Sequence, residues 1–170
     1  GGGELIAETA VDLGQPVAGD GLVAEGIDVT HVTRVAGIGS GTASITVADG
    51  ENQIVVVPAA NGRVTPAHVE AARETLRGAD AVLVQLEIPL DAVEATLRIA
   101  HDEGVPVILN PAPAQPLPRE WLAQVRFLTP NQHELATVLG QPGDTDFREL
   151  MRLAPCPGVL TRGAEGAWFR

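Results

Sequence analysis

The chain has 170 residues, of which 45% are hydrophobic, and a formal net charge of −11 at pH 7. This apolar content predicts one globular domain with a substantial core. The excess of acidic residues, with basic residues scattered along the chain, argues against nonspecific binding to nucleic acid or to an anionic membrane. The sequence contains no lysine, which excludes a P-loop NTPase and Schiff-base chemistry on lysine.

No apolar run approaches the roughly 20 residues that a membrane-spanning helix needs. The first residues also lack the pattern of a secretory signal peptide. We therefore expect a soluble, cytoplasmic protein with no membrane partner. The single Cys156 agrees with a reducing compartment and is best interpreted as a small packed hydrophobe. Because the chain opens on three glycines and stops at what looks like a strand, we expect it to be incomplete at both ends.

The first third of the chain predicts a small antiparallel sheet after a less regular start. Residues 4–13 have the pattern of an amphipathic helix that ends at Gly14. Apolar and polar residues then alternate, as in half-buried strands, over three segments: 29–35, 42–48 and 52–57. Asp49-Gly50 suits a two-residue hairpin turn between the last two segments.

From residue 65 onward, strand and helix patterns alternate, which predicts an α/β unit with a mainly parallel sheet. Thr65-Pro66 supplies an N-cap and a proline at the first helical position, for a helix that runs to about Arg77. The apolar runs of strand length are 81–86, 105–109, 126–129 and 159–161. The helical patterns are 91–101, 118–124, 131–139 and 146–153.

Polar residues follow three of the predicted parallel strands. Glu87 comes after the first of them, Asn110 after the second, and Asn131 with Glu134 after the third. Ligands of open parallel sheets bind beyond the carboxyl ends of the strands, so we expect these residues to share one site. Taken alone, Glu87 would be a solvated loop carboxylate, and Asn110 would start a rigid proline-fixed connector.

Two motifs have both a structural and a functional interpretation. The spacing of Asn131 and Glu134 is that of a capping box, which is the favoured interpretation when the motif stands alone. The same geometry puts an amide and a carboxylate where they could position a phosphate and the water shell of Mg²⁺. Residues 161–166 form a glycine-containing turn that could present backbone N–H groups to phosphate or simply reverse the chain.

Taken together, several strings of the sequence resemble the ribokinase-like (PfkB) family of carbohydrate kinases. Their order and spacing match the family over nearly the whole chain, which corresponds to the middle of a family member. The strings are LVAEGIDVTHV at 22–32, SGTASITVADGENQIVVVPAAN at 40–61, ADAVLVQLEIP at 79–89, VILNPAPAQPLP at 107–118, LTPNQHE at 128–134 and LTRGAEGAWF at 160–169.

The resemblance implies a three-layer α/β/α sandwich with a mainly parallel sheet, formed by residues 1–28 and 58–170. Residues 29–57 would form a small antiparallel β lid. The implied reaction is transfer of the γ-phosphoryl group of ATP to a sugar hydroxyl, O5 of D-ribose. ATP and Mg²⁺ are the implied cofactors, and a requirement for a monovalent cation such as K⁺ stays open. The implied assembly is a homodimer formed through the lid.

The resemblance also implies roles for individual residues. Glu87 would hydrogen-bond the sugar, Ala43 would contact it from the lid, and Glu134 would help hold Mg²⁺ through water. Gly1 and Gly3 stand near the family's early G-G-x-G-x-N sugar-binding motif, which the chain matches poorly. The residues expected on the nucleotide side are Asn131, Thr161, Arg162, Gly163, Ala164, Glu165 and Gly166, with Asn110 on the phosphate side.

No catalytic residue is assigned within the chain. The family's catalytic base is an aspartate in a G-A-G-D motif, which has no match here and is expected beyond Arg170. Other hypotheses stay open: a kinase for another sugar or a nucleoside, or a non-catalytic relative that binds sugar or nucleotide. A Rossmann dehydrogenase is disfavoured because no G-x-G-x-x-G opens a helix after a first strand.

Overall fold

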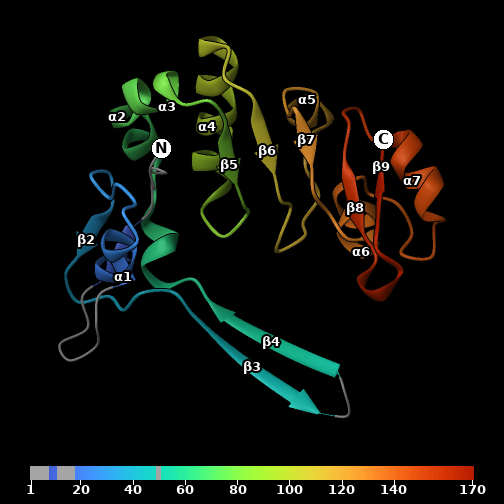
Figure 1. Ribbon diagram of the computed structural model, residues 1–170, viewed down its shortest axis with the longest axis horizontal. Coiled ribbons are helices and arrows are strands. Elements are labelled where there is room, and N and C mark those ends of the chain that lie inside the picture. Colours follow the sequence, from blue (N-terminus) through green and yellow to red (C-terminus); the bar gives the residue numbers. More distant parts are fainter. Residues whose placement is uncertain (1–7, 11–17, 49–50) are drawn as a thin grey trace.

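The computed structural model describes residues 8–10, 18–48 and 51–170 and has the mixed α/β class that the sequence predicts (Figure 1). Its strands are β1 (Glu8–Ala10), β2 (Thr33–Val35), β3 (Thr42–Ala48), β4 (Glu51–Val57), β5 (Val82–Val84), β6 (Val107–Leu109), β7 (Phe127–Leu128), β8 (Val159–Thr161) and β9 (Ala167–Phe169). Its α-helices are α1 (Ala18–Ala24), α2 (Pro66–Ala71), α3 (Arg73–Gly78), α4 (Leu90–Glu103), α5 (Arg119–Leu122), α6 (Gln132–Val138) and α7 (Phe147–Leu153). The described residues also form two 3₁₀ helices, η1 (Ala59–Arg63) and η2 (Gly163–Glu165).

A parallel sheet is the centre of the molecule. Strands β5, β6 and β7 pair in that order. Parallel bridges from Leu128 to Gly158 and from Asn131 to Thr161 continue the sheet to β8, against which β9 runs antiparallel. The carboxyl ends of β5 to β8 therefore meet at one edge, the lower edge in Figure 1. The parallel strands predicted from the apolar runs are confirmed.

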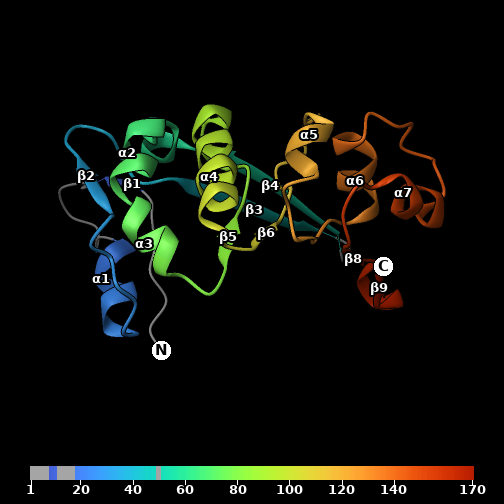
Figure 2. The ribbon, with the colours of Figure 1, turned by 90° about the horizontal axis from the view of Figure 1, so that it is seen from above.

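The core lies between this sheet and the helices that cover one of its faces (Figure 2). Helix α4 is packed most deeply, with Val93, Leu97 and Ile99 fully buried. Its apolar side chains recur every three or four residues, which produces one continuous buried face. Gly104 ends the helix in the left-handed conformation (φ 73°) that glycine adopts without strain.

The opposite face of the sheet carries an apolar row that is exposed at Leu83 and half-buried at Ile108 and Phe127. Leu83 is 76% exposed, whereas its neighbours Val82 and Val84 are buried. The register places Leu83 beside Ile108, and Ile108 beside Phe127. Right-handed crossovers between strands that advance in one direction put every connecting helix on the same side of a sheet. Within the described residues, the second helical layer of the expected sandwich does not cover this row.

The segment 29–57 contributes to two different sheets. Strands β3 and β4 form the expected antiparallel hairpin, with Thr42 opposite Val57 and Ala48 opposite Glu51. Strand β2 instead pairs in parallel with β1, so the prediction that 29–35 joins the antiparallel sheet is wrong. Alternating burial along a strand does not identify its partner strand, which explains the error. The predicted turn at residues 49 and 50 lies outside the described residues.

The start of the chain also differs from the helix predicted over residues 4–13. Residues 8–10 form β1, and the rest of that segment lies outside the described residues. Helix α1 occupies Ala18–Ala24, where the sequence predicts no regular element. Its two glycines, Gly19 and Gly21, have poor helix propensity, so the local pattern carries little helical signal.

The helix predicted from Thr65 to Arg77 is two helices, α2 and α3. They are separated at Ala72, whose backbone (φ −96°, ψ 9°) departs from helical values. The predicted start is confirmed: the Thr65 side chain caps α2, and Pro66 is its first residue. His68 completes the cap because its Nδ1 accepts a hydrogen bond from the Thr65 backbone N–H at 3.1 Å.

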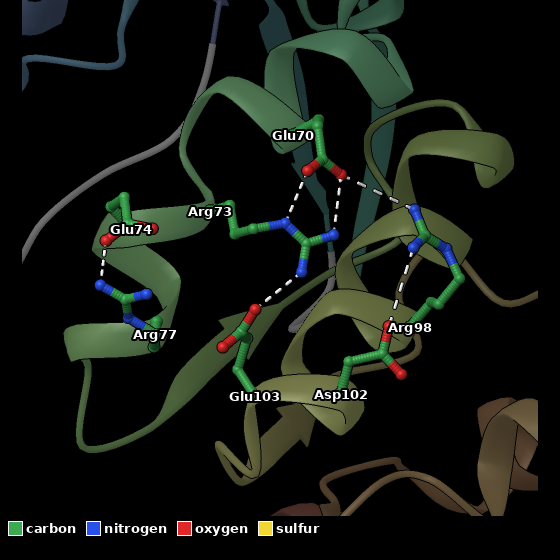
Figure 3. Close-up of polar contacts among 7 residues, drawn as sticks. All are labelled: Glu70, Arg73, Glu74, Arg77, Arg98, Asp102 and Glu103. Carbon is green, nitrogen blue, oxygen red and sulfur yellow. Dashed lines mark hydrogen bonds and ion pairs between the residues drawn. The ribbon is translucent and has the colours of Figure 1, made fainter.

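An ion-pair network joins α2, α3 and α4 (Figure 3). Arg73 donates from Nε and Nη2 to the two carboxylate oxygens of Glu70, at 2.5 and 3.0 Å. Its Nη1 donates to Glu103 of α4 at 2.7 Å. Arg98 lies 3.9 Å from Glu70 and 3.8 Å from Asp102. The hydrogen bond from Arg73 holds the pKa of the Glu70 carboxyl below its ordinary value.

Replacing Arg73 is expected to weaken this helix junction. Arg73→Met removes all three of its hydrogen bonds, so Tm should fall at low ionic strength and the loss should shrink in concentrated NaCl. Arg73→Lys should recover only part of the loss, because lysine lacks the planar fork that engages two carboxylates. Since the folded pKa of Glu70 is lowered, this stabilisation is present above the ordinary carboxylate pKa. It should disappear as the pH falls through the lowered value.

The matched control is Arg77→Met, which removes only the exposed pair between Arg77 and Glu74 within α3. Exposed pairs of this kind contribute little to stability. Thermal unfolding of the Arg73 and Arg77 variants, measured across salt and pH, should therefore give unequal losses. Equal losses would contradict a special role for Arg73.

Cys156 is a buried thiol, with 6% of its surface exposed. Burial raises the pKa of this thiol from 9.0 to about 11. The side chain belongs to the hydrophobic core, as its interpretation as a packed hydrophobe predicts. Because the sequence has no lysine and no tyrosine, Cys156 is its one side chain with an ordinary pKa between about 8 and 11.

We therefore expect a single-site loss of stability in alkali. The unfolded thiol ionises first as the pH rises, so the contribution of Cys156 to the free energy of unfolding should be constant below the ordinary thiol pKa. It should then fall by about 2 to 3 kcal/mol as the pH approaches 11. Urea unfolding followed by tryptophan fluorescence would measure this. The same loss in Cys156→Ala would show that another group is responsible.

Candidate functional site

The carboxyl edge of the parallel sheet brings together the loops that the sequence singled out. Glu87 lies three residues after β5 and is exposed, and Asn110 directly follows β6 and is half-buried. Backbone hydrogen bonds extend beyond the strands, from Asn110 N–H to the Val84 carbonyl and from Leu86 N–H to the Ala112 carbonyl, both at 2.9 Å. The loops of Glu87 and Asn110 are therefore held against each other.

The helix start after β7 is a complete capping box. The Asn131 side-chain oxygen accepts a hydrogen bond from the Glu134 backbone N–H at 2.8 Å. In return, Glu134 Oε2 accepts one from the Asn131 backbone N–H, also at 2.8 Å. The capping interpretation of this motif is confirmed. One carboxylate oxygen of Glu134 is thus engaged with backbone, which suits contact with a metal through water better than direct coordination.

The Asn131 loop lies beside the loop that follows β8. Asn131 and Thr161 form a parallel bridge, and the Thr161 backbone N–H donates to the Pro130 carbonyl at 2.9 Å. These contacts bring together two groups that are 30 positions apart in the chain. The N-terminus of α6 and the start of the segment 161–166 therefore form one continuous surface.

The segment 161–166 is a tight turn between β8 and β9. The Arg162 N–H donates to the Gly166 carbonyl at 2.8 Å, and the Gly166 N–H donates to the Gly163 carbonyl at 3.1 Å. Gly163 (φ 53°) and Gly166 (φ 84°) have positive φ angles that strain residues with a side chain. Glycine is therefore required here by the backbone, whether or not the turn also binds a ligand.

The hairpin β3–β4 projects from the body beneath the carboxyl edge of the sheet (Figures 1 and 2). Ala43 lies on β3 opposite Val56 and is exposed. Residues two apart on a strand share a face, so Ala43 shares its face with Ile45 and Val47. These two side chains are 59% and 71% exposed. An isolated two-stranded hairpin with such exposure needs a further surface to pack against.

Two of the sequence predictions lie beyond what the structure describes. Gly1 and Gly3 are outside the described residues.

The described residues also bear on the predicted Mg²⁺ site. Among residues 8–10, 18–48 and 51–170, no group of three or more His, Cys, Asp or Glu side chains lies close enough together to hold a metal ion. Mg²⁺ in phosphoryl-transfer sites needs only one or two carboxylates, because phosphate and water oxygens supply the remaining ligands. Glu134 fits such a role.

Two contacts near this edge have no signal in the sequence. The Arg162 side chain stacks on Phe147 of α7, with Cζ 4.2 Å from the ring centroid, and pairs with Glu165 at 2.8 Å. A hollow of about 160 Å³ lies near Phe147 and Trp168, between α7 and β9.

Among the described helices, none is long and apolar enough to cross a membrane.

Comparisons with known proteins agree with the fold and identify the family. The family model for pfkB family carbohydrate kinases matches residues 13–170. Ribokinase of Bacillus subtilis (strain 168) is 37% identical over 148 residues, which are 87% of this chain and 50% of that protein. Deoxyribokinase of Salmonella typhi is 34% identical over 150 residues, which are 84% of this chain and 49% of that protein.

A solved structure also matches. Arabidopsis thaliana ribokinase complexed with ribose and ATP superimposes with a TM-score of 0.76 at 26% sequence identity, over 98% of this chain and 57% of that one. The chain spans about half the length of the curated relatives it matches. The ribokinase-like fold implied by the sequence motifs is confirmed, and this chain belongs to the pfkB family of carbohydrate kinases.

Proposed function

We propose that this chain is part of an ATP-dependent kinase that transfers the γ-phosphoryl group to O5 of D-ribose and forms ribose 5-phosphate. One observation carries the proposal: a single edge of the sheet holds both the loop with the exposed Glu87 carboxylate and the glycine-containing turn 161–166, whose backbone N–H groups could bind phosphate. The loop of Glu87 is held against that of Asn110, and Asn131 is bridged to Thr161 at the same edge. Ribokinase relatives at 36% and 37% identity support the choice of ribose.

The sugar side of the site is assigned to Glu87 and the hairpin. The exposed carboxylate of Glu87 can accept hydrogen bonds from two sugar hydroxyls, which orients the ring. Ala43 is small, so β3 can close over the sugar without a clash. Closure would exclude water and prevent transfer of the phosphoryl group to it.

The phosphate side is assigned to the α6 start and the turn after β8. Asn131 and the backbone of Thr161, Gly163 and Ala164 would bind ATP phosphates, with Asn110 nearby. Glu134 would hold Mg²⁺ through water. When bound, Mg²⁺ neutralises charge on the phosphates, and phosphoryl transfer otherwise depends mainly on positioning. We place the general base in the family's G-A-G-D motif, outside the residues of this chain.

The domain arrangement and assembly belong to the same proposal. Of the predicted lid at 29–57, the hairpin β3–β4 would act as the lid on the core, and two such lids would pair in a cytoplasmic homodimer. The hairpin supports this because aliphatic side chains are exposed on both of its faces. They include Ile45 (59%), Ile54 (51%), Val55 (59%) and Val57 (52%). One face can cover the sugar while the other packs on a second copy.

Other substrates remain as alternatives because a deoxyribokinase is also a close relative, at 34% identity. We would separate them by assaying the complete protein with ATP and Mg²⁺ against ribose, deoxyribose, fructose and adenosine, measuring ADP release. Ribose should give the highest kcat/KM. A higher kcat/KM for another acceptor would identify that compound, rather than ribose, as the substrate. Ribose binding without ADP release would indicate a non-catalytic relative.

Glu87→Gln is expected to raise KM for ribose by about 10- to 100-fold, because it weakens a hydrogen bond to a charged acceptor. KM for ATP should change little. Glu94→Gln, at an exposed position on α4, is the matched control and should behave as the wild type. Unchanged ribose kinetics in the Glu87 variant would contradict its placement in the sugar site.

Asn131 combines a capping role with the proposed phosphate role, and two variants separate them. Asn131→Ser keeps a good N-cap, so stability should hold, but the loss of the amide should raise KM for ATP about 10-fold. Asn131→Ala should show the same kinetic loss and also unfold about 0.5–2 kcal/mol more easily. Wild-type kinetics in Asn131→Ser would leave Asn131 as a cap alone.

A further inference from the structure

Arg162 makes both backbone and side-chain contacts within the turn that follows β8. Its backbone N–H donates to the Gly166 carbonyl at 2.8 Å, and its carbonyl accepts from the Glu165 N–H at 3.0 Å. The Arg162 guanidinium pairs with Glu165 across the turn at 2.8 Å. The Arg162 side chain is only 24% exposed, whereas that of Glu165 is 66% exposed. Arg162 is therefore fixed by backbone and side chain together.

The guanidinium of Arg162 also stacks on a buried ring. Its Cζ lies 4.2 Å from the centroid of Phe147, the first residue of α7, which is 5% exposed. Trp168, which follows the turn on β9, packs its ring against the same Phe147 at 5.0 Å and 60°. Phe147 thus contacts Arg162 within the turn and Trp168, which lies beyond the end of the turn.

This double attachment matters because the turn contains residues of wide conformational freedom. It contains two glycines at positive φ, Gly163 and Gly166, and glycine has the greatest conformational freedom of any residue. Backbone N–H groups bind phosphate well only when they are already oriented, since ordering a loop on binding lowers affinity. A turn that binds phosphates therefore needs an external support.

We propose that Arg162 is a positioning residue: it ties the nucleotide-binding turn to α7 through Phe147, is itself held in place by Glu165, and does not contact the nucleotide. This inference rests on the proposed function, which makes residues 161–166 the nucleotide turn. It assigns Arg162 a role different from that of the other turn residues. Its guanidinium lies over α7, whereas the backbone of Gly163 and Ala164 is left to meet the phosphates.

The test uses the complete protein with Arg162→Leu, which keeps an apolar contact with Phe147 but removes the cation and the ion pair. We expect KM for ATP to rise about 3- to 10-fold, with KM for ribose and kcat unchanged. Hydrogen exchange of residues 161–167 should become faster. Arg162→Lys should restore part of both effects, and Glu165→Gln should give a smaller change in the same direction.

Arg148→Leu is the matched control. Arg148 stacks on Phe147 and Trp168, at 4.7 Å from each ring, but lies outside the turn. Exchange of the turn should therefore stay at its wild-type rate in this variant. An equal increase in the exchange rate of the turn in both variants would overturn the specific role of Arg162.

The remaining outcomes separate this inference from the proposed function. Unchanged exchange and KM in Arg162→Leu would overturn the positioning role. A higher KM for ATP with unchanged exchange would overturn it in favour of direct nucleotide contact. Faster exchange in a protein whose wild type binds no ATP would support the attachment while contradicting the proposed kinase.

Discussion

The parallel register of β5 to β8 is the constraint on which the rest of the molecule depends. Because these strands run in one direction, every loop that leaves their carboxyl ends meets the same edge of the sheet. Right-handed crossovers then place the connecting helices on one face and build the core there. The same rule leaves the other face without a connecting helix among the described strands, and Leu83 is exposed there.

Local signals predicted the elements that form this edge. The strand runs and the capping box of Asn131 and Glu134 depend on residues within a few positions of one another, and the structure has them as predicted. Features set by distant partners could not be predicted in this way. Strand β2 pairs with β1 rather than with the hairpin, and Phe147 meets Arg162 across 15 positions. Nothing in either segment alone indicates its partner.

Several residues at the edge have a structural role that is established and a functional role that is proposed. Asn131 and Glu134 start α6, and in the proposal the same two side chains would also face phosphates and Mg²⁺. Glycine at 163 and 166 is required by backbone geometry, and the same turn would supply N–H groups to ATP. Phe147 closes the core beneath that turn. If the proposed sites bind, the same residues serve both binding and stability, so variants that separate the two are the most informative.

The central claim is that sugar and nucleotide meet at this one edge, beneath the hairpin β3–β4. A crystal structure of the complete protein with ribose and a non-hydrolysable ATP analogue tests it most directly. We predict ribose between Glu87 and the hairpin, and phosphates between Asn131 and the turn 161–166. Ligands bound elsewhere, or a sugar without contact to Glu87, would contradict the claim.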